Sequence, residues 1–303
     1  MNNSLRAFAL LFPVAIFFSS CGGSSSSEKA KAEADEVAFS EAEKKIVSDM
    51  DQVIHDLPSP TEVPYLLQAT GADYNAELIN SLEKLPQYQT NEDEAALNLG
   101  VYATDMGYLI SYNKIEEATN YMESCQKLAE SLGVASVFNV ATIEKFQNNL
   151  NNADSLNKIL SEAIIEAESK LENADRATMA ALVLTGSFVE GLHLAVRVIE
   201  TYPTDVLDEE NRNLILEPMV KVVLDQKKPL LDVIAMLKDL PQDDIIAKMI
   251  AELNILRILY DGDLAEIEEK ISENTGNFVL TQDMLLDITK EVKRVRRDIV
   301  EYK

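Results

Sequence analysis

The sequence predicts an all-α protein, and three observations lead to this fold class. Apolar residues recur three and four positions apart, which is the helical period, as in the series Ile246, Met249, Ile250, Leu253, Leu256 and Tyr260. Glycines and prolines fall mostly at the breaks between such segments, where helices begin and end. The chain lacks sustained two-residue alternation, and it lacks Asn-Gly or Asp-Gly turns between β-branched runs, so β-hairpins are not expected.

Each expected helix is an apolar-periodic segment bounded by helix-breaking residues. Pro60 precedes the segment at 61–69 and Gly71 follows it, while Gly133 and Pro203 end two longer segments. From the amino terminus, the expected helices span residues 37–56, 61–69, 74–84, 92–112, 115–132, 136–149, 153–171, 175–201, 208–225, 229–239, 243–260, 263–273 and 281–301.

The short connections predict that consecutive helices pack as antiparallel hairpins. Two arrangements fit: an irregular multi-helix bundle, or a short stack of helical hairpins like a tetratricopeptide array. Residues 98–133 resemble a tetratricopeptide hairpin, but the two helices are too long for a 34-residue repeat and no second copy occurs at that period. The sequence therefore favours the bundle or an irregular solenoid.

Charge and cysteine content limit the possible partners. The formal net charge is -25, so the surface repels nucleic acid and anionic lipid headgroups, whereas basic proteins, cations and neutral ligands remain possible. Cys125 falls in an apolar helical series and is expected to be a core thiol. The chain has two cysteines, Cys21 and Cys125. Because Cys21 is the expected site of lipidation, no disulfide within the chain is expected.

The amino terminus resembles a bacterial lipoprotein signal. Arg6 precedes an apolar run of 12 residues, Ala7 to Phe18, and Ser19-Ser20 then leads to Cys21. This run is too short to cross a hydrocarbon core, which takes about 20 residues. The resemblance implies cleavage before Cys21, diacylglycerol on its sulfur, and acylation of the new amino terminus by a fatty acid such as palmitate, which together anchor the protein in a membrane.

These features divide the chain into a signal peptide at 1–20, a lipidated Cys21 with a flexible tether at 21–36, and an all-helical domain at 37–303, with a possible subdivision near 202–208. Gly22 is similar to the outer-membrane sorting pattern of enteric lipoproteins. An acidic cluster directly behind Cys21, which would resemble a surface-export signal, is lacking. An outer-membrane lipoprotein facing the periplasm is therefore expected.

Two helices carry polar residues in otherwise apolar surroundings. In the helix at 92–112, small residues (Gly100, Thr104, Gly107 and Ser111) form one face that another helix can approach closely, and Asp105 lies beside Tyr102 and Tyr108. In the helix at 175–201, the residues Gly186, Glu190, His193 and Arg197 share a face. In one interpretation these groups pair structurally: Glu190 with His193, Arg197 or a helix end, and Asp105 with tyrosine hydroxyls from which it accepts hydrogen bonds. In the other, Tyr102, Asp105, Tyr108, Glu190 and His193 line a pocket for a small polar ligand.

Three further segments carry a family resemblance. Pro58-Ser59-Pro60-Thr61-Glu62 with Gly71-Ala72-Asp73-Tyr74, then Asn98 to Asp105, and then Gly186 to Leu192 together resemble an uncharacterised family of helical lipoproteins from Bacteroidota. The resemblance covers most of the chain after the signal. It implies an exported all-helical domain and no nameable activity, so no catalytic residue is carried over.

Enzyme and metal signatures are lacking. The sequence has no G-x-S-x-G, H-E-x-x-H, G-x-G-x-x-G, P-loop or paired C-x-x-C motif. Its two histidines, His55 and His193, cannot form a His-rich transition-metal site. No cofactor and no catalytic residue is expected, although an enzyme remains the third hypothesis after a binding protein and a receptor.

The last helix is the one basic segment of this acidic chain. Leu285, Ile288, Val292, Val295 and Ile299 form a seam of two heptads that docks the helix onto a partner surface. The cations Lys290, Lys293, Arg294, Arg296 and Arg297 lie mostly outside that seam. They either complement the helix dipole and the acidic surface, or provide a docking point for an acidic partner, and the seam could also support self-association.

Together these observations predict a lipid-anchored cell-envelope protein that acts by binding, as a scaffold or interaction module. The alternative is a receptor for a small polar ligand, with a pocket between the helices at 92–112 and 175–201. The receptor needs a closed pocket of about 300 Å³ or more, whereas the scaffold needs an exposed groove.

Overall fold

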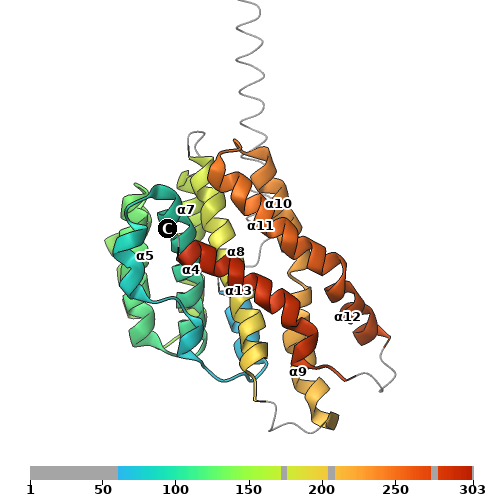
Figure 1. The fold of residues 1–303 in the computed structure, drawn as a ribbon. Coiled ribbons are helices and arrows are strands. Elements are labelled where there is room, and N and C mark those ends of the chain that lie inside the picture. Colours follow the sequence, from blue (N-terminus) through green and yellow to red (C-terminus); the bar gives the residue numbers. More distant parts are fainter. Residues whose placement is uncertain (1–60, 172–175, 204–208, 274–278, 302–303) are drawn as a thin grey trace, which may run out of the picture. The chain divides into compact units, whose positions relative to one another are not determined.

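The chain folds into helices joined by short turns in this computed structural model, which describes residues 61–171, 176–203, 209–273 and 279–301 (Figure 1). Within these ranges there is no β-strand, which confirms the all-α class. The α-helices are α2 (Glu62–Ala69), α3 (Leu85–Tyr88), α4 (Glu92–Ser111), α5 (Ile115–Ser131), α6 (Val140–Asn148), α7 (Ala153–Leu171), α8 (Ala177–Thr201), α9 (Glu209–Leu224), α10 (Lys227–Asp239), α11 (Asp244–Asp261), α12 (Asp263–Ser272) and α13 (Leu286–Val300), and the 3₁₀ turns are η1 (Ala76–Leu78), η2 (Leu82–Lys84), η3 (Ala135–Phe138) and η4 (Gln282–Leu285).

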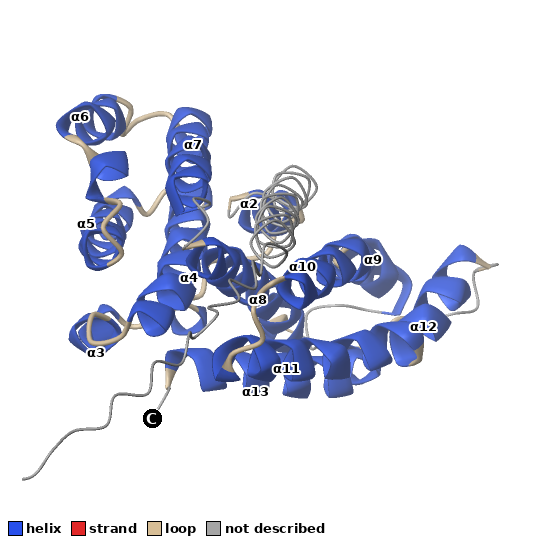
Figure 2. Ribbon diagram, turned by 90° about the horizontal axis from the view of Figure 1, so that it is seen from above, coloured by secondary structure: helices blue, strands red, loops and turns tan. Residues whose placement is uncertain are grey.

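Helix α8 is the centre of the packing. It contacts α2, α4, α7, α9, α10 and α13, and Figure 2 shows it between the helices of the first half of the chain and those of the second. The stretch from Ala180 to Val196 is buried without interruption. One central helix surrounded by others is an irregular bundle, because the repeats of a hairpin stack contact only their neighbours.

Helix α8 is also long and apolar enough to cross a membrane, judged by length and composition alone. In this protein 89% of its apolar stretch is buried by the surrounding helices, and the core helix of a soluble domain passes the same test. Its hydropathy is therefore accounted for by its central place in the fold.

Helices α4 and α8 cross at two glycines. A Cβ atom on Gly100 would overlap the backbone of Val183 and Ser187, and one on Gly186 would overlap the backbone of Leu97. Ser187 donates a hydrogen bond to the carbonyl oxygen of Gly100 at 3.3 Å. The small-residue face thus allows backbone-to-backbone contact, as its spacing predicted.

The expected helix at 74–84 is not formed. Asn75 and Ser81 each accept a hydrogen bond from the backbone N–H two residues further on, which starts the short turns η1 and η2 instead. Between those turns, the backbone N–H and carbonyl of Asn80 bond to side chains of α4 and α5, and so are not available to a helix. The expected helices at 136–149 and 281–301 likewise each begin with a 3₁₀ turn.

The expected signal peptide at 1–20, the tether at 21–36 and the helix at 37–56 lie outside the described residues. The described residues on either side of 204–208 belong to one compact unit, Lys44–Lys303. Helix α8 on one side contacts α9, α10 and α13 on the other, so the described helices share one core across the position where a subdivision was considered.

Candidate functional site

Asp105 of α4 and Glu190 of α8 meet in the core of the protein. Both side chains are fully buried, and their carboxyl groups are hydrogen-bonded to each other. Oδ2 of Asp105 also accepts a hydrogen bond of 3.0 Å from the backbone N–H of Asn80. The sequence placed these two carboxylates on separate helices, and the close crossing of α4 and α8 brings them together.

Arg296 of α13 forms the ion pair with Glu190. Its Nε lies 2.8 Å from Oε2 and its Nη2 lies 2.9 Å from Oε1, which is a bidentate arrangement. The expectation that Arg197 pairs with Glu190 is therefore corrected. Arg197 instead binds Glu200 at the end of α8, and Lys293 reaches Glu200 at 3.1 Å.

The pKa values of the two carboxyl groups are shifted in opposite directions. Burial, and then the charge of Glu190, raise the pKa of Asp105 well above its usual value. Burial also acts to raise the pKa of Glu190, but Arg296, His193 and the hydrogen bond to Asp105 lower it below its usual value. The fold therefore favours the protonated form of Asp105 and the ionised form of Glu190. Oδ1 of Asp105 has no hydrogen-bond partner within the described residues.

His193 completes the charged cluster as a neutral imidazole. Burial is the main cause that lowers its pKa to about 4; Arg296 and Arg197 act in the same direction, and Glu190 acts against them. The ring is hydrogen-bonded to the backbone of Leu78. Its Nδ1 has no hydrogen-bond partner within the described part of the chain.

The tyrosines hold the segment between Asn75 and Ser81. Tyr102 donates to the carbonyl of Ser81 at 2.9 Å, and the hydroxyl of Tyr108 accepts from the backbone N–H of Asn75 at 3.0 Å. Tyr121 donates to the carbonyl of Asn80 at 2.6 Å. The structure thus brings Tyr102, Asp105, Tyr108, Glu190 and His193 into one cluster, and most of their polar atoms bind the protein's own backbone or Arg296. Among the described residues, Oδ1 of Asp105 and Nδ1 of His193 are the exceptions.

Four residues of this cluster were not among the site residues predicted from the sequence: Asn80, Tyr88, Tyr121 and Arg296. Asn80 makes the most contacts in the cluster, because its side-chain amide donates to the hydroxyl of Tyr88 in addition to its backbone hydrogen bonds. The hydroxyl of Tyr88 in turn donates to the carbonyl of Val300 at 2.8 Å. Arg296 had a usable signal, since it lies four residues after Val292 and three before Ile299 and so shares their buried side of α13.

Every residue of the predicted apolar seam is buried against other parts of this chain: Leu285 in η4, and Ile288, Val292, Val295 and Ile299 in α13. Helix α13 contacts α8, α11 and α4. The cations beside the seam include Lys293, Arg294 and Arg296, which pair with Glu200, Glu252 and Glu190 respectively. The seam and these cations therefore join α13 to its own protein.

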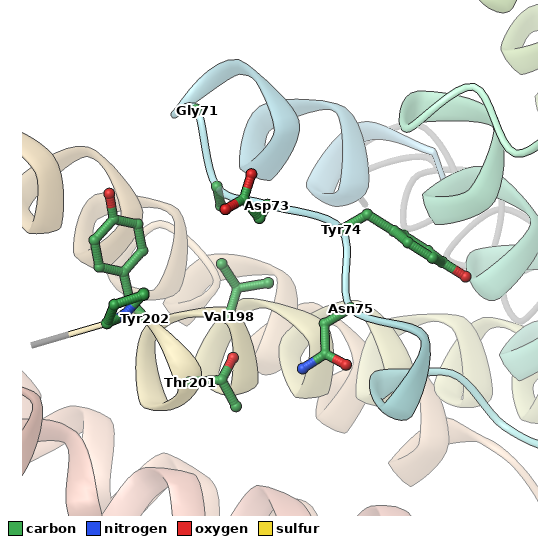
Figure 3. Close-up of a pocket in the computed structure, with 9 residues that line it drawn as sticks. Gly71, Asp73, Tyr74, Asn75, Val198, Thr201 and Tyr202 are labelled. Atoms are coloured by element: carbon green, nitrogen blue, oxygen red, sulfur yellow. The ribbon is translucent and has the colours of Figure 1, made fainter. Parts of the chain in front are cut away.

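The surface has a groove at the carboxyl end of α8. It has a volume of about 370 Å³, is open to solvent on one side, and is lined by Gly71, Ala72, Asp73, Tyr74, Asn75, Val198, Thr201, Tyr202 and Pro203 (Figure 3). Gly71 allows the sharp turn out of α2, since its φ of 82° is unfavourable for other residues. In Figure 3 the ring of Tyr74 extends away from Asp73 and Val198, and it packs on Tyr108 with centroids 5.6 Å apart.

A smaller hollow of about 150 Å³ adjoins the same end of α8. It is lined by Ile199, Glu200, Gln282, Asp283, Leu285, Leu286 and Thr289. The side-chain amide of Gln282 donates to the carbonyl oxygens of Ile199 and Tyr202 at 2.6 and 2.8 Å, which ties η4 to the last turn of α8.

Within the described residues no three His, Cys, Asp or Glu side chains are grouped so that they could hold a metal ion. Cys125 is a free, fully buried thiol whose pKa is raised by burial, as expected of a core residue.

Comparisons of the chain with models of protein families, with curated proteins and with solved structures give no match.

Proposed function

We propose that this chain is a lipid-anchored cell-envelope protein that acts by binding, as a scaffold or interaction module. The observation that carries the proposal is that the buried polar cluster is occupied by the protein itself. Glu190 is bound by Arg296, Asp105 by Asn80 and Glu190, and the tyrosines by the backbone of residues 75–81. Because these groups are engaged internally, ligand recognition is left to the surface, where the two hollows at the end of α8 lie.

The anchor rests on the sequence Ser19-Ser20-Cys21-Gly22 behind its apolar run. We expect the acylated protein to reside in the outer membrane and face the periplasm. Replacement of Cys21 by Ala should abolish partitioning into the detergent phase of a phase-separating nonionic detergent. The matched control is Cys125→Ala, which removes the other, buried thiol and should partition like the wild type. Unchanged partitioning of Cys21→Ala would refute the lipid anchor.

The binding role is tested on protein solubilised from its own membrane. Native mass spectrometry after mild cross-linking in intact cells should show the chain in a complex of defined mass. The same complex should be absent when the cross-linker is omitted and the sample is denatured. A chain that runs only as a monomer under several detergents and cross-linkers contradicts the interaction-module proposal.

The receptor alternative is supported by one observation, the groove of about 370 Å³, which falls within the size range of small-molecule sites. This groove lies at the end of α8, and at the crossing of α4 and α8 the backbones touch at Gly100 and Gly186. Thermal denaturation in the presence of a panel of small polar compounds separates the two functions. A concentration-dependent rise in Tm with one compound favours the receptor.

A further inference from the structure

The two surface hollows share the carboxyl-terminal turn of α8. Val198, Thr201 and Tyr202 face the larger hollow, whereas Ile199 and Glu200 face the smaller one. The last helical carbonyl groups carry the negative end of the helix dipole, and no basic residue lies in the last turn of α8. Gln282 donates to the carbonyls of Ile199 and Tyr202, and this end of α8 is still the negative end of its dipole.

The charged side chains that line the hollows are all acidic. Asp73 lines the larger hollow, and Asp283 and Glu200 line the smaller one. Glu200 is neutralised by Arg197 and Lys293. Asp73 and Asp283 are both exposed, and neither forms an ion pair with a described residue. Each hollow thus presents one uncompensated carboxylate beside a helix end that is negative as well.

Apolar atoms lie next to each of these carboxylates. The larger hollow is lined by Val198, Tyr202 and Pro203 as well as by Asp73, and Figure 3 shows Tyr202 and Val198 on the α8 side of it. At the smaller hollow, the side chain of Leu286 is 58% exposed, although the preceding residue, Leu285, is buried. A carboxylate beside apolar atoms suits a long basic side chain, whose charged head pairs with the acid while its methylene stem packs on the apolar atoms.

We propose that the carboxyl end of α8 is a docking surface for a basic segment of a partner protein, with one arginine or lysine side chain on Asp73 and a second on Asp283. This inference rests on the proposed binding function and names the class of partner. A protein segment fits better than a free amine, because each hollow is open and a single exposed ion pair contributes little. Two such contacts in one segment reinforce each other through a high effective concentration.

The probe is a fluorescein-labelled peptide of alternating glycine and arginine, titrated with the full detergent-solubilised protein and followed by fluorescence anisotropy at fixed ionic strength. Its matched control has citrulline, which is uncharged and of similar shape, in place of arginine. The test variant is Asp73→Asn/Asp283→Asn. The control variant, Glu123→Gln/Glu130→Gln, removes two exposed acids of α5 and gives the same change in net charge. Circular dichroism establishes that all variants are folded.

The expected result is that the test variant weakens arginine-peptide binding by about five-fold or more, whereas the control variant leaves it within about two-fold and the citrulline peptide binds no variant measurably. Equal losses in the two variants would overturn the proposal, since the attraction would then be diffuse. Competition by free agmatine at the same concentration as the peptide would also overturn it, in favour of a small-amine site. Neither outcome bears on the complex seen by native mass spectrometry, so failure of this surface and failure of the binding function are distinguishable.

Discussion

Glu190 and Arg296 form two parallel hydrogen bonds although they lie 106 residues apart in the chain. The Glu190 side chain is fully buried and that of Arg296 is 15% exposed, so each is the charge partner that allows the other to be buried. The pair fixes α13 against α8, and the hydrogen bond from Tyr88 to the carbonyl of Val300 fixes the end of the same helix. These polar contacts hold α13 in one position in an interface that is otherwise apolar.

Breaking this pair on one side should be strongly destabilising. Glu190→Gln or Arg296→Met each leaves a buried charge without its partner, and we expect the free energy of unfolding to fall by about 3–5 kcal/mol. The double variant Glu190→Met/Arg296→Met removes both charges and should recover most of that loss. Urea denaturation of the three variants beside the wild type measures the coupling between the two residues.

An exposed ion pair provides the control for this experiment. Glu162 lies 3.8 Å from Lys158 on the surface of α7, and Glu162→Gln should leave the urea midpoint unchanged. If Glu190→Gln also left the urea midpoint unchanged, or raised it, Glu190 would be a residue kept for ligand binding. Helix α8 would then be the first place to search for that ligand.

The sequence predicted that Asp105 and Glu190 need partners, and it offered His193, which does lie beside Glu190. It missed Arg296, and it offered tyrosine hydroxyls to Asp105, which instead accepts from the backbone N–H of Asn80. Helical spacing reveals only neighbours on the same helix, so it offered His193 and Arg197 as partners of Glu190. The true partner, Arg296, comes from a distant helix, and its place depends on how α13 docks. Asn80 was missed because its role depends on three contacts with other elements, none of which leaves a pattern along the chain.

The helical segments themselves were largely predictable. The ends of α4, α8 and α11 agree with the expectation within two residues, because apolar spacing and capping are local properties. The segment 74–84 was predicted as a helix because its apolar spacing allows one. Long-range hydrogen bonds from Tyr121 and to Asp105 hold its backbone in turns instead, and such tertiary effects override local propensity.

Replacement of Asp105 by Asn should be neutral or stabilising. Asn retains an N–H that can donate to Glu190 and an oxygen that can accept from the backbone N–H of Asn80. It therefore mimics the protonated acid that the raised pKa favours in the folded protein. By contrast, Asp105→Ala leaves the N–H of Asn80 without its acceptor and should cost about 1–3 kcal/mol.

The same substitution should change how stability depends on pH. Because the folded pKa of Asp105 is raised, the folded protein holds this proton while the unfolded chain releases it above about pH 4. The stability that Asp105 contributes through this bound proton is complete below about pH 4, and it is lost as pH rises towards the pKa of Asp105 in the folded protein. The advantage of Asp105→Asn over the wild type, measured by urea denaturation, should therefore grow with pH above about 4. A constant difference across pH 4 to 9 would show that Asp105 is ionised in the folded protein.

His193 should weaken the fold in acid. Its folded pKa of about 4 lies below the ordinary value of 6.5, so the unfolded chain takes up a proton that the folded protein resists. Stability from this group is complete above pH 6.5 and declines as pH falls to about 4, by up to about 3 kcal/mol. His193→Gln, which keeps a side-chain N–H donor, should be less stable than the wild type at pH 7 and should lose less stability on acidification. Parallel pH profiles for the two proteins would exclude His193 as the source of the acid sensitivity.

Two glycines of α8 should respond in opposite ways to the same substitution. Gly186→Ala places a methyl group onto the backbone of Leu97 in α4, and neither backbone can yield, so the helices must separate. We expect a loss of about 2–3 kcal/mol, as for other overpacked cores. At Gly191 a new Cβ would lie 3.7 Å from Val63 of α2, which is an ordinary contact, and alanine is the better helix former. Gly191→Ala should therefore be neutral or stabilising by up to about 1 kcal/mol. Thermal and urea denaturation of the two variants side by side decides the matter: equal stabilities would mean that α4 and α8 do not touch at Gly186 in solution.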